Sequence, residues 1–198
     1  MTETKIVKLK DQTEVLIRPM TRDDIENSLA FFCALPEEDR AYLRRDVTQP
    51  EVVAERVREM EEGNVKRLIA LVGGKIVTDG ALELSSYAWK RHMGEMRLIV
   101  ARSYQHNGLG MLMARELYDI ARSLGLEEIV VRIMGSQTAA RNMVTKLGFH
   151  EEAVLRKYLK DHQGRKQDLI LMRCDLEELW RDFERLVCEM DAPAWRMD

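Results

Sequence analysis

The sequence has few cysteines, and those it has are far apart. Cys33, Cys174 and Cys188 are the only three in 198 residues, and they form no CxxC pair. No histidine stands beside them at the spacing of metal ligands, so a zinc site and a disulfide framework are both disfavoured. We therefore expect three buried thiols and no metal.

Long hydrophobic runs and charge of one sign are also lacking. The apolar runs have the length of strands, and the N-terminal residues 1–15 lack the continuous apolar core of a secretory signal. The 31 Lys and Arg residues are interleaved with 34 Asp and Glu residues, for a formal net charge of −3, whereas nucleic-acid binding needs a basic surface. We expect a cytoplasmic protein that binds neither a membrane nor nucleic acid.

Hydrophobic periodicity predicts one domain of mixed strands and helices. Alternating or continuous apolar runs indicate strands, and apolar residues at i, i+3, i+4 and i+7 indicate helices. The order favours an α/β (α+β) fold with a mixed central sheet and helices on both faces. The expected strands cover 13–20, 65–72, 75–86, 94–102, 127–134, 150–161 and 165–175, and the expected helices cover 21–35, 48–63, 110–125 and 138–148.

Turn and cap residues mark the ends of several elements. Thr48 and Glu51 have the spacing of a capping box, and Pro50 suits the first turn of the same helix. Gly73-Gly74 between two apolar runs is the strongest hairpin signal in the chain. Asp175 and Glu178 have the spacing of a cap pair for a last amphipathic helix, which packs either on the domain or at a subunit interface.

Residues 97–125 join an apolar strand to a long amphipathic helix through a loop with two glycines. Glycines allow successive backbone N–H groups to turn toward one bound group, and the helix behind them adds positive potential. Both features favour a phosphate or pyrophosphate. The loop lacks the Lys of a P-loop and the third glycine of a dinucleotide fingerprint, so neither of those nucleotide sites fits.

What remains at this junction is Gln105-x-x-Gly108-x-Gly110, with Val100 five residues before Gln105. This loop resembles the coenzyme A loop of the GNAT superfamily of N-acetyltransferases, in which Gln or Arg precedes x-x-Gly-x and then Gly or Ala. The later sequences KLGF (146–149) and DLILM (168–172) fit the same family. The resemblance covers about residues 13–174, so it implies a GNAT domain over 1–174 with a mostly antiparallel sheet, followed by a C-terminal helix and tail over 175–198.

The resemblance implies acetyl-CoA as cosubstrate and assigns residues to it. The backbone of Leu98, Ile99 and Val100 is expected to pair with the pantetheine arm as an added strand. Gln137 stands where the family often has an Asn that touches the cofactor. Val144 replaces a frequent Tyr that protonates the departing thiolate, so another donor or water must serve. The residues expected to form the pyrophosphate loop are Gln105, His106, Asn107, Gly108, Leu109, Gly110 and Met111.

A carboxylate is expected near the reaction, because an amine attacks a thioester only when it is neutral. Glu95 is the first candidate: the loop and its strand are similar to the GNAT domains of bacterial protein lysine acetyltransferases, in which a Glu at this position is the general base. The structural alternative is a strand-edge Glu paired with Arg97 or Arg132. Glu83 is the second candidate base, and Tyr158 is a candidate donor near the thiolate.

The acceptor amine stays open at the level of sequence. The wall for the acceptor is expected in residues 31–47, and its candidate lining residues are Phe31, Phe32, Tyr42, Arg44 and Arg45. In the alternative, Phe32 and Leu35 belong to the core and the two arginines form solvated or salt-bridged surface. The acidic run 36–40 either attracts a cationic acceptor or begins a helix. A protein lysine, a small amine (polyamine, amino sugar or amino acid) and a non-catalytic acyl-CoA sensor are the alternatives. The protein is expected to be a monomer or a homodimer.

Overall fold

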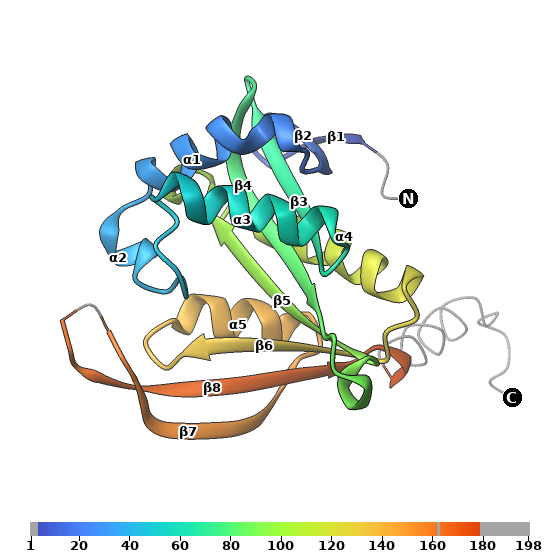
Figure 1. Ribbon diagram of the computed structural model, residues 1–198, viewed down its shortest axis with the longest axis vertical. Helices are drawn as coiled ribbons and strands as arrows, with labels where there is room; N and C mark the ends of the chain where they lie inside the picture. The colour runs from blue at the N-terminus through green and yellow to red at the C-terminus, as the bar shows by residue number, and fades with distance from the viewer. Residues whose placement is uncertain (1–3, 162, 179–198) are drawn as a thin grey trace, which may run out of the picture.

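The computed structural model describes residues 4–161 and 163–178 (Figure 1). Three short 3-10 turns, Arg22–Asp24, Ala88–Lys90 and Arg102–Tyr104, accompany the main elements. The strands are β1 (Lys5–Lys8), β2 (Glu14–Pro19), β3 (Val65–Val72), β4 (Lys75–Leu84), β5 (Met93–Val100), β6 (Glu128–Met134), β7 (His150–Lys160) and β8 (Lys166–Asp175). The helices are α1 (Ile25–Ala34), α2 (Glu37–Arg40), α3 (Pro50–Glu61), α4 (Leu109–Ser123) and α5 (Thr138–Lys146).

The strands form one sheet in the order β1-β2-β3-β4-β5-β6-β8-β7. Among the described residues every neighbouring pair is antiparallel except β5 and β6, which run parallel. The expected mixed, mostly antiparallel sheet is confirmed. Strand β1 was missed because four mainly exposed residues at the sheet edge give no hydrophobic signal.

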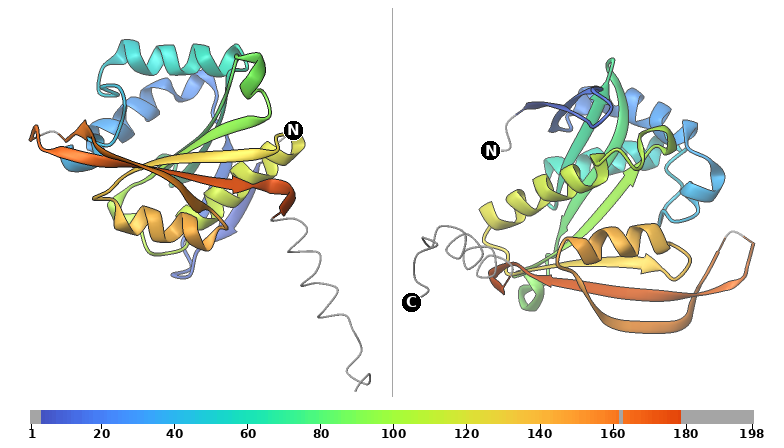
Figure 2. Two further views of the ribbon diagram at one scale, coloured as in Figure 1. Left: turned by 90° about the horizontal axis from the view of Figure 1, so that it is seen from below. Right: turned by 180° about the vertical axis from the view of Figure 1, so that it is seen from behind.

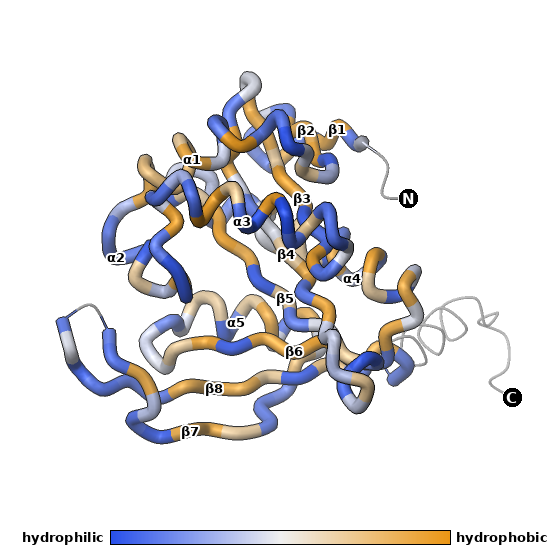
Figure 3. Tube along the Cα trace, in the orientation of Figure 1, coloured by the Kyte–Doolittle hydropathy of each residue, from blue (hydrophilic) through white to orange (hydrophobic). Residues whose placement is uncertain are grey.

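Helices cover both faces of the sheet, as expected. Figure 2 shows α1 and α3 on one face and α4 and α5 on the other. Hydropathic colouring shows apolar segments along β3, β6 and β8, whereas α2 is mainly hydrophilic (Figure 3). Each face of the sheet therefore has its own hydrophobic cluster, and the sheet separates them.

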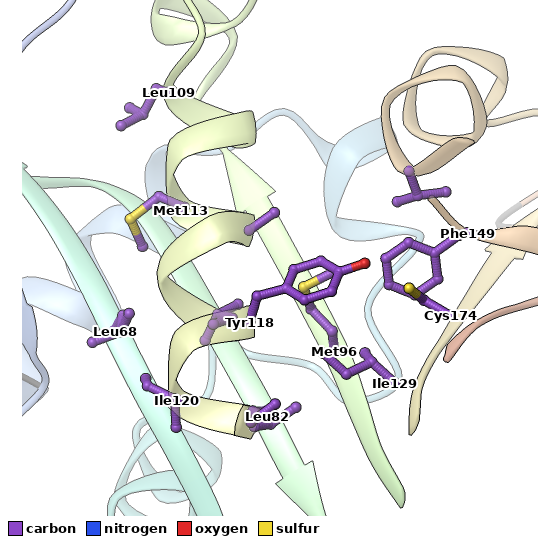
Figure 4. Close-up of a cluster of buried hydrophobic side chains, with 14 of the residues drawn as sticks. Leu68, Leu82, Met96, Leu109, Met113, Tyr118, Ile120, Ile129, Phe149 and Cys174 are labelled. Atoms are coloured by element: carbon purple, nitrogen blue, oxygen red, sulfur yellow. The ribbon is translucent and has the colours of Figure 1, made fainter. Parts of the chain in front are cut away.

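Helix α4 lies at the centre of the larger cluster (Figure 4). Met113, Leu117 and Ile120 are buried on the predicted stripe, but Leu124 is 42% exposed. Leu124 is the C-cap of α4, where the chain leaves the helix, so the periodic pattern extends one position too far. Tyr118 also faces the core, where its hydroxyl donates a hydrogen bond to the carbonyl oxygen of Leu147.

The start of α3 differs from the sequence prediction. Pro50 occupies the first turn as expected, but the N-cap is Gln49 and no side chain caps the helix. The hydroxyl of Thr48 instead donates to Asp46 at 2.6 Å, so the predicted capping box with Glu51 is wrong. An acidic residue two positions before Thr48 competes for its hydroxyl locally. At the other end, Gly63 follows α3 with a φ of +82°.

The C-terminal helix begins within the described residues. Asp175 accepts a hydrogen bond from the backbone N–H of Glu178 at 2.8 Å, so the predicted cap at Asp175 is confirmed. Leu176 packs against the larger core cluster. The rest of the predicted helix, with Cys188, lies outside the described residues. Within the described part of the chain, no helix is long and apolar enough to cross a membrane.

The other two cysteines occupy different environments. Cys174 on β8 is a buried free thiol, as expected, whereas Cys33 on α1 is exposed. The expectation of burial was therefore wrong for Cys33. Its neighbours Phe31 and Phe32 are the residues of α1 that face the sheet, and Cys33 follows them onto the opposite side of the helix.

A buried ionic triad holds α3 to the sheet. Asp79 of β4 accepts hydrogen bonds from Arg56 of α3 at 2.9 Å and from Arg67 of β3 at 2.6 Å. All three side chains are at least nine-tenths buried, and the Arg56 guanidinium lies 4.4 Å from the centre of the Phe32 ring. Burial of two cations against one anion makes the single carboxylate essential to this face.

The triad predicts a large stability loss on removal of Asp79. Asp79→Ala leaves two buried guanidinium groups without their anion, and we expect the free energy of unfolding in urea to fall by about 3–5 kcal/mol. Glu151→Ala is the control, because Glu151 pairs with Arg141 at the surface and such pairs contribute about 0–1 kcal/mol. Equal losses in the two variants would contradict this account.

Candidate functional site

The junction between β5 and α4 exposes backbone donors. After the 3-10 turn Arg102–Tyr104, His106 and Gly108 adopt left-handed conformations with φ of +64° and +87°, and α4 then begins at Leu109. The first N–H groups of a helix have no acceptor within the helix. The positive end of the 15-residue α4 lies at the same point. The loop can therefore bind an anion.

Glycine is favoured at the two positions of the loop for different physical reasons. Gly108 faces open space, and only its left-handed φ favours glycine. Gly110 is tightly packed: a Cβ there would lie 3.1 Å from the sulfur of Met143 and 3.7 Å from Cγ2 of Val100. Gly108 therefore shapes the loop, whereas Gly110 allows α4 to approach β5 and α5 closely.

The loop side chains are engaged in contacts that hold its shape. Gln105 Nε2 donates to the carbonyl oxygen of Val100 at 2.9 Å. Asn107 Nδ2 donates to Asp11 Oδ2 at 2.9 Å, which joins the loop to the turn between β1 and β2. Leu109 is fully buried in the core. The backbone of the loop, rather than these three side chains, is therefore the part that is available to a ligand. The contact with Asp11 was not expected, because nothing local links residues 96 positions apart.

Strands β5 and β6 diverge beside this loop (Figure 1). Their ladder pairs Met93 with Glu128, Gly94 with Ile129 and Glu95 with Val130. Strand β5 continues to Val100 and β6 to Met134, but among the described residues no further pair joins them. The last part of β5 thus has one sheet edge without a partner strand.

The direction of the backbone groups follows from one hydrogen bond. The N–H of Ala101 donates to the carbonyl oxygen of Val77 on β4 at 2.9 Å. Backbone groups of successive strand residues point to opposite sides. Those of Val100 and Leu98 therefore point away from β4, toward the diverging β6, whereas those of Ile99 point toward β4. An extended ligand between β5 and β6 could pair with Leu98 and Val100 as an added strand.

Two residues expected near the cofactor lie on α5. Gln137 is the N-cap of α5, and its Oε1 accepts a hydrogen bond from the N–H of Met134 at 2.9 Å. Its side-chain oxygen therefore closes the turn after β6, and its amide nitrogen is left for any ligand contact. Val144 is buried in the larger core cluster.

The candidate bases lie opposite each other on β4 and β5. Glu83 and Glu95 are cross-strand partners, and two like charges in that position repel. Arg44 bridges them: its Nη1 lies 3.5 Å from Glu83 Oε2, and its Nη2 contacts Glu95 Oε1. Arg132 Nη1 lies 3.2 Å from Glu95 Oε2, and Arg97 Nε lies 3.2 Å from Glu83 Oε1.

The expected structural alternative for Glu95 is thus present in part. Glu95 pairs with Arg132, as that alternative predicted, and also with Arg44. The sequence predicted Arg44 as a candidate lining residue of the acceptor wall and did not predict its pairing with Glu95. Arg97 pairs with Glu83 instead. Glu95 is 16% exposed, so a small group can still reach it. A role as base requires that the incoming amine, or one water, reach a carboxylate oxygen of Glu95 beside these two arginines.

The three arginines around Glu83 and Glu95 carry more positive charge than the two carboxylates neutralise. Burial, followed by repulsion from Arg97, lowers the pKa of Arg44 to about 10, and Arg132 acts in the same direction while Glu83 opposes them. Burial also lowers the pKa of Arg97, again against the attraction of Glu83. Three guanidinium groups and two carboxylates therefore meet where β5 and β6 begin to diverge.

Most of the other residues predicted near the acceptor or the thiolate make structural contacts. Phe31 belongs to the smaller core cluster, and Arg45 pairs with Glu55 and Glu59 of α3. The acidic run forms α2, where Asp39 binds Arg102 at 2.9 Å, so its alternative reading as a helix start is confirmed. Tyr158 is 64% exposed on β7, the edge strand two positions from β6.

A loop of backbone donors at a helix start, beside a strand with an unpaired edge in a split sheet, is an arrangement that could hold an extended anionic ligand. Comparison with known proteins makes this assignment specific. The family model of the acetyltransferase (GNAT) family matches residues 25–149, well over half of the chain. The chain therefore belongs to the acetyltransferase (GNAT) family, and acetyl-CoA is the cosubstrate that this membership supports.

Solved structures share the fold at low sequence identity. yncA of Salmonella typhimurium, solved with its cofactor acetyl-CoA, has a TM-score of 0.71 and 20% identity over 82% of this chain and 94% of its own. The GNAT domain of PAT from S. lividans has a TM-score of 0.69 and 17% identity, over 87% and 96%. A spermidine N-acetyltransferase chimera that includes the Vibrio cholerae enzyme has a TM-score of 0.70 and 18% identity, over 84% and 98%.

The unpaired edge of β5 predicts a difference in amide exchange along one strand. In the ligand-free protein we expect the N–H groups of Leu98 and Val100 to exchange with deuterium faster than that of Ala101, which is bonded to β4. Nuclear magnetic resonance of the labelled protein measures all three in one sample. Slow exchange at Leu98 and Val100, equal to that at Ala101, would show that this edge is covered.

Proposed function

We propose that the protein is an N-acetyltransferase that moves an acetyl group from acetyl-CoA to a primary amine by direct attack, without a covalent enzyme intermediate. The observation that carries this proposal is the junction of β5 and α4, where an unpaired strand edge leads into a loop of backbone donors. Coenzyme A has both matching parts, an extended amide-containing arm and a pyrophosphate. The cysteines have no role in this reaction.

In this proposal the loop binds the pyrophosphate through backbone N–H groups between His106 and Met111, including those of Asn107, Gly108, Leu109 and Gly110. Gln105 supports the loop by its bond to Val100. The pantetheine arm pairs with the free edge at Leu98 and at the N–H of Val100, whose carbonyl oxygen already accepts from Gln105. Ile99 holds the strand to β4. Gln137 contacts the cofactor through its amide nitrogen. The thioester then lies where β5 and β6 separate, next to Glu95.

The chemistry needs a proton acceptor. An amine with a pKa near 10.4 is protonated at neutral pH, and its deprotonation costs about 4 kcal/mol there. We assign this proton to Glu95, directly or through one water, with Glu83 as the alternative. A backbone N–H on the last part of β5 would polarise the thioester carbonyl. Because Val144 cannot protonate the departing thiolate, that proton comes from another donor or from water.

The acceptor in this proposal is a primary amine. A protein lysine and a small amine both remain compatible with the loop and the base. A sensor that binds acyl-CoA without reaction would keep the loop but would not need Glu95. The protein is taken to act as a monomer or a homodimer, with no metal.

The loop assignment predicts a selective loss of cofactor binding. Gly108→Glu places a carboxylate at the anion site, and we expect the Kd for acetyl-CoA to rise about 100-fold or more by calorimetry. Gly74→Glu is the matched control, because Gly74 also has a left-handed φ (+77°) and open space, but lies in the turn between β3 and β4. Unchanged affinity in Gly108→Glu, or equal loss in both variants, would place the cofactor elsewhere.

The base assignment predicts a loss of turnover that depends on pH. Glu95→Gln should lower kcat at neutral pH by about 100-fold or more, because general-base catalysis contributes that much. The deficit should shrink toward pH 10, where the amine loses its proton unaided, and the Kd for acetyl-CoA should stay within about two-fold. Thiol release with a reactive amine measures the rate.

Two further variants make this result specific. Glu151→Gln, at an exposed surface pair, should keep full activity. Glu83→Gln should have the smaller effect of the two site carboxylates, and a larger effect would move the base to Glu83. Full turnover by Glu95→Gln at neutral pH refutes the assignment, and binding of acetyl-CoA without turnover of any amine by the native protein would favour the sensor.

A further inference from the structure

Three arginines from separate parts of the fold meet around Glu83 and the proposed base, Glu95. Arg44 comes from the segment between α2 and α3, Arg97 from β5 and Arg132 from β6. Pairing of β5 with β6 ends at Glu95 and Val130, so Arg97 and Arg132 are the next residues on the same face and flank the point of divergence. Arg97 lies two residues, about 7 Å, along β5 from the proposed base Glu95. Arg132 reaches Glu95 from β6, with Nη1 3.2 Å from Oε2.

The guanidinium groups of Arg97 and Arg132 have several hydrogen-bond donors each and are partly exposed. Each guanidinium group carries five N–H donors. The closest contact in each ion pair is made by one of these nitrogens, Nε of Arg97 to Glu83 and Nη1 of Arg132 to Glu95. Both side chains remain accessible, with exposed fractions of 33% and 42%. A ligand can therefore reach the guanidinium groups of both arginines from solvent.

Within the ion pairs around Glu83, Glu95 and Asp79, positive charges outnumber negative ones. Six guanidinium groups, those of Arg44, Arg45, Arg56, Arg67, Arg97 and Arg132, face five carboxylates. Repulsion among these cations is visible at Arg97, whose pKa is lowered by burial and then by Arg67, Arg45 and Arg132 against the attraction of Glu83. An added anion would relieve this repulsion, whereas a polycation would increase it.

We infer, on the basis of the proposed acetyl transfer, that the acceptor is a small amine that also carries an anionic group, and that Arg97 and Arg132 bind this group. The amine faces Glu95 while the carboxylate or phosphate beside it accepts hydrogen bonds from the two guanidinium forks, which match such groups geometrically. Glu95 takes one proton from the ammonium group, the neutral nitrogen attacks the thioester carbon, and the C–S bond breaks. The second nitrogen proton passes to the departing thiolate of coenzyme A, directly or through water. Arg97 and Arg132 are thus specificity residues rather than catalytic ones.

The test compares acceptors that differ only in the anionic group. Thiol release from acetyl-CoA is measured with amino acids and with the amines that lack their carboxylate, such as tyrosine against tyramine and methionine against 3-(methylthio)propylamine. Phosphoethanolamine against ethanolamine tests a phosphate, and spermidine and a lysine-containing peptide test cationic acceptors. We expect the anionic member of at least one pair to have a kcat/KM at least ten-fold above its partner and above both cationic acceptors.

Variants connect this preference to the two arginines. Arg97→Gln and Arg132→Gln should raise the KM of the preferred anionic acceptor about ten-fold or more, with a smaller change in kcat and none in the Kd for acetyl-CoA. Arg97→Lys and Arg132→Lys keep the charge and should recover part of the affinity. Arg22→Gln is the control, since Arg22 forms an exposed pair with Glu61.

The outcomes separate this inference from the proposed function. Turnover of spermidine, the peptide or the uncharged amines at equal or higher kcat/KM overturns the anionic acceptor and leaves acetyl transfer in place. The same holds if both Gln variants, still folded by thermal unfolding and still binding acetyl-CoA, keep the native selectivity. Failure of the native protein to bind acetyl-CoA overturns the proposed function, and the acceptor class falls with it.

Discussion

The early end of the pairing between β5 and β6 is the constraint on which the site depends. These strands pair over three residues and then separate, while β5 stays bound to β4 along its length. The separation leaves backbone groups of Leu98 and Val100 without a strand partner, and it leads directly to the donors at the start of α4. Gly110 keeps α4 against this strand, and Gln105 anchors the loop to Val100. Strand edge, loop and helix start therefore form one continuous surface.

The two faces of the sheet differ in the kind of interaction that dominates them. On the face of α4 and α5, apolar packing around Met113 and Leu117 fixes the helix whose N-terminus carries the anion site. On the face covered by α1 and α3, the strands carry many charged side chains. They include the buried pair of Arg67 with Asp79 and the partly exposed pair of Arg132 with Glu95. Charges on this second face are well placed for acid–base chemistry and for recognition of an acceptor, because β5 connects them to the unpaired edge.

Much of the secondary structure could be predicted, because strong periodicity and glycine punctuation act locally. The hairpin at Gly73-Gly74 and the stripe of α4 are examples. Errors arose where a local pattern has two solutions. Thr48 bonds to Asp46 instead of capping α3, and Cys33 faces away from the sheet although its neighbours are buried. Strand β1 was invisible because only pairing with β2, and no apolar stripe, defines it.

The sequence by itself determined the strand, the loop of Gln105, Gly108 and Gly110, and the helix behind it, because backbone conformation and helix polarity are local properties. It also put Glu95 on the strand that enters the loop. Only the tertiary structure decided which partners Glu95 has, since Arg44 and Arg132 arrive from distant segments. It alone separated β5 from β6 and gathered three arginines at that point, because strand pairing and ion pairs join residues whose spacing along the chain carries no signal.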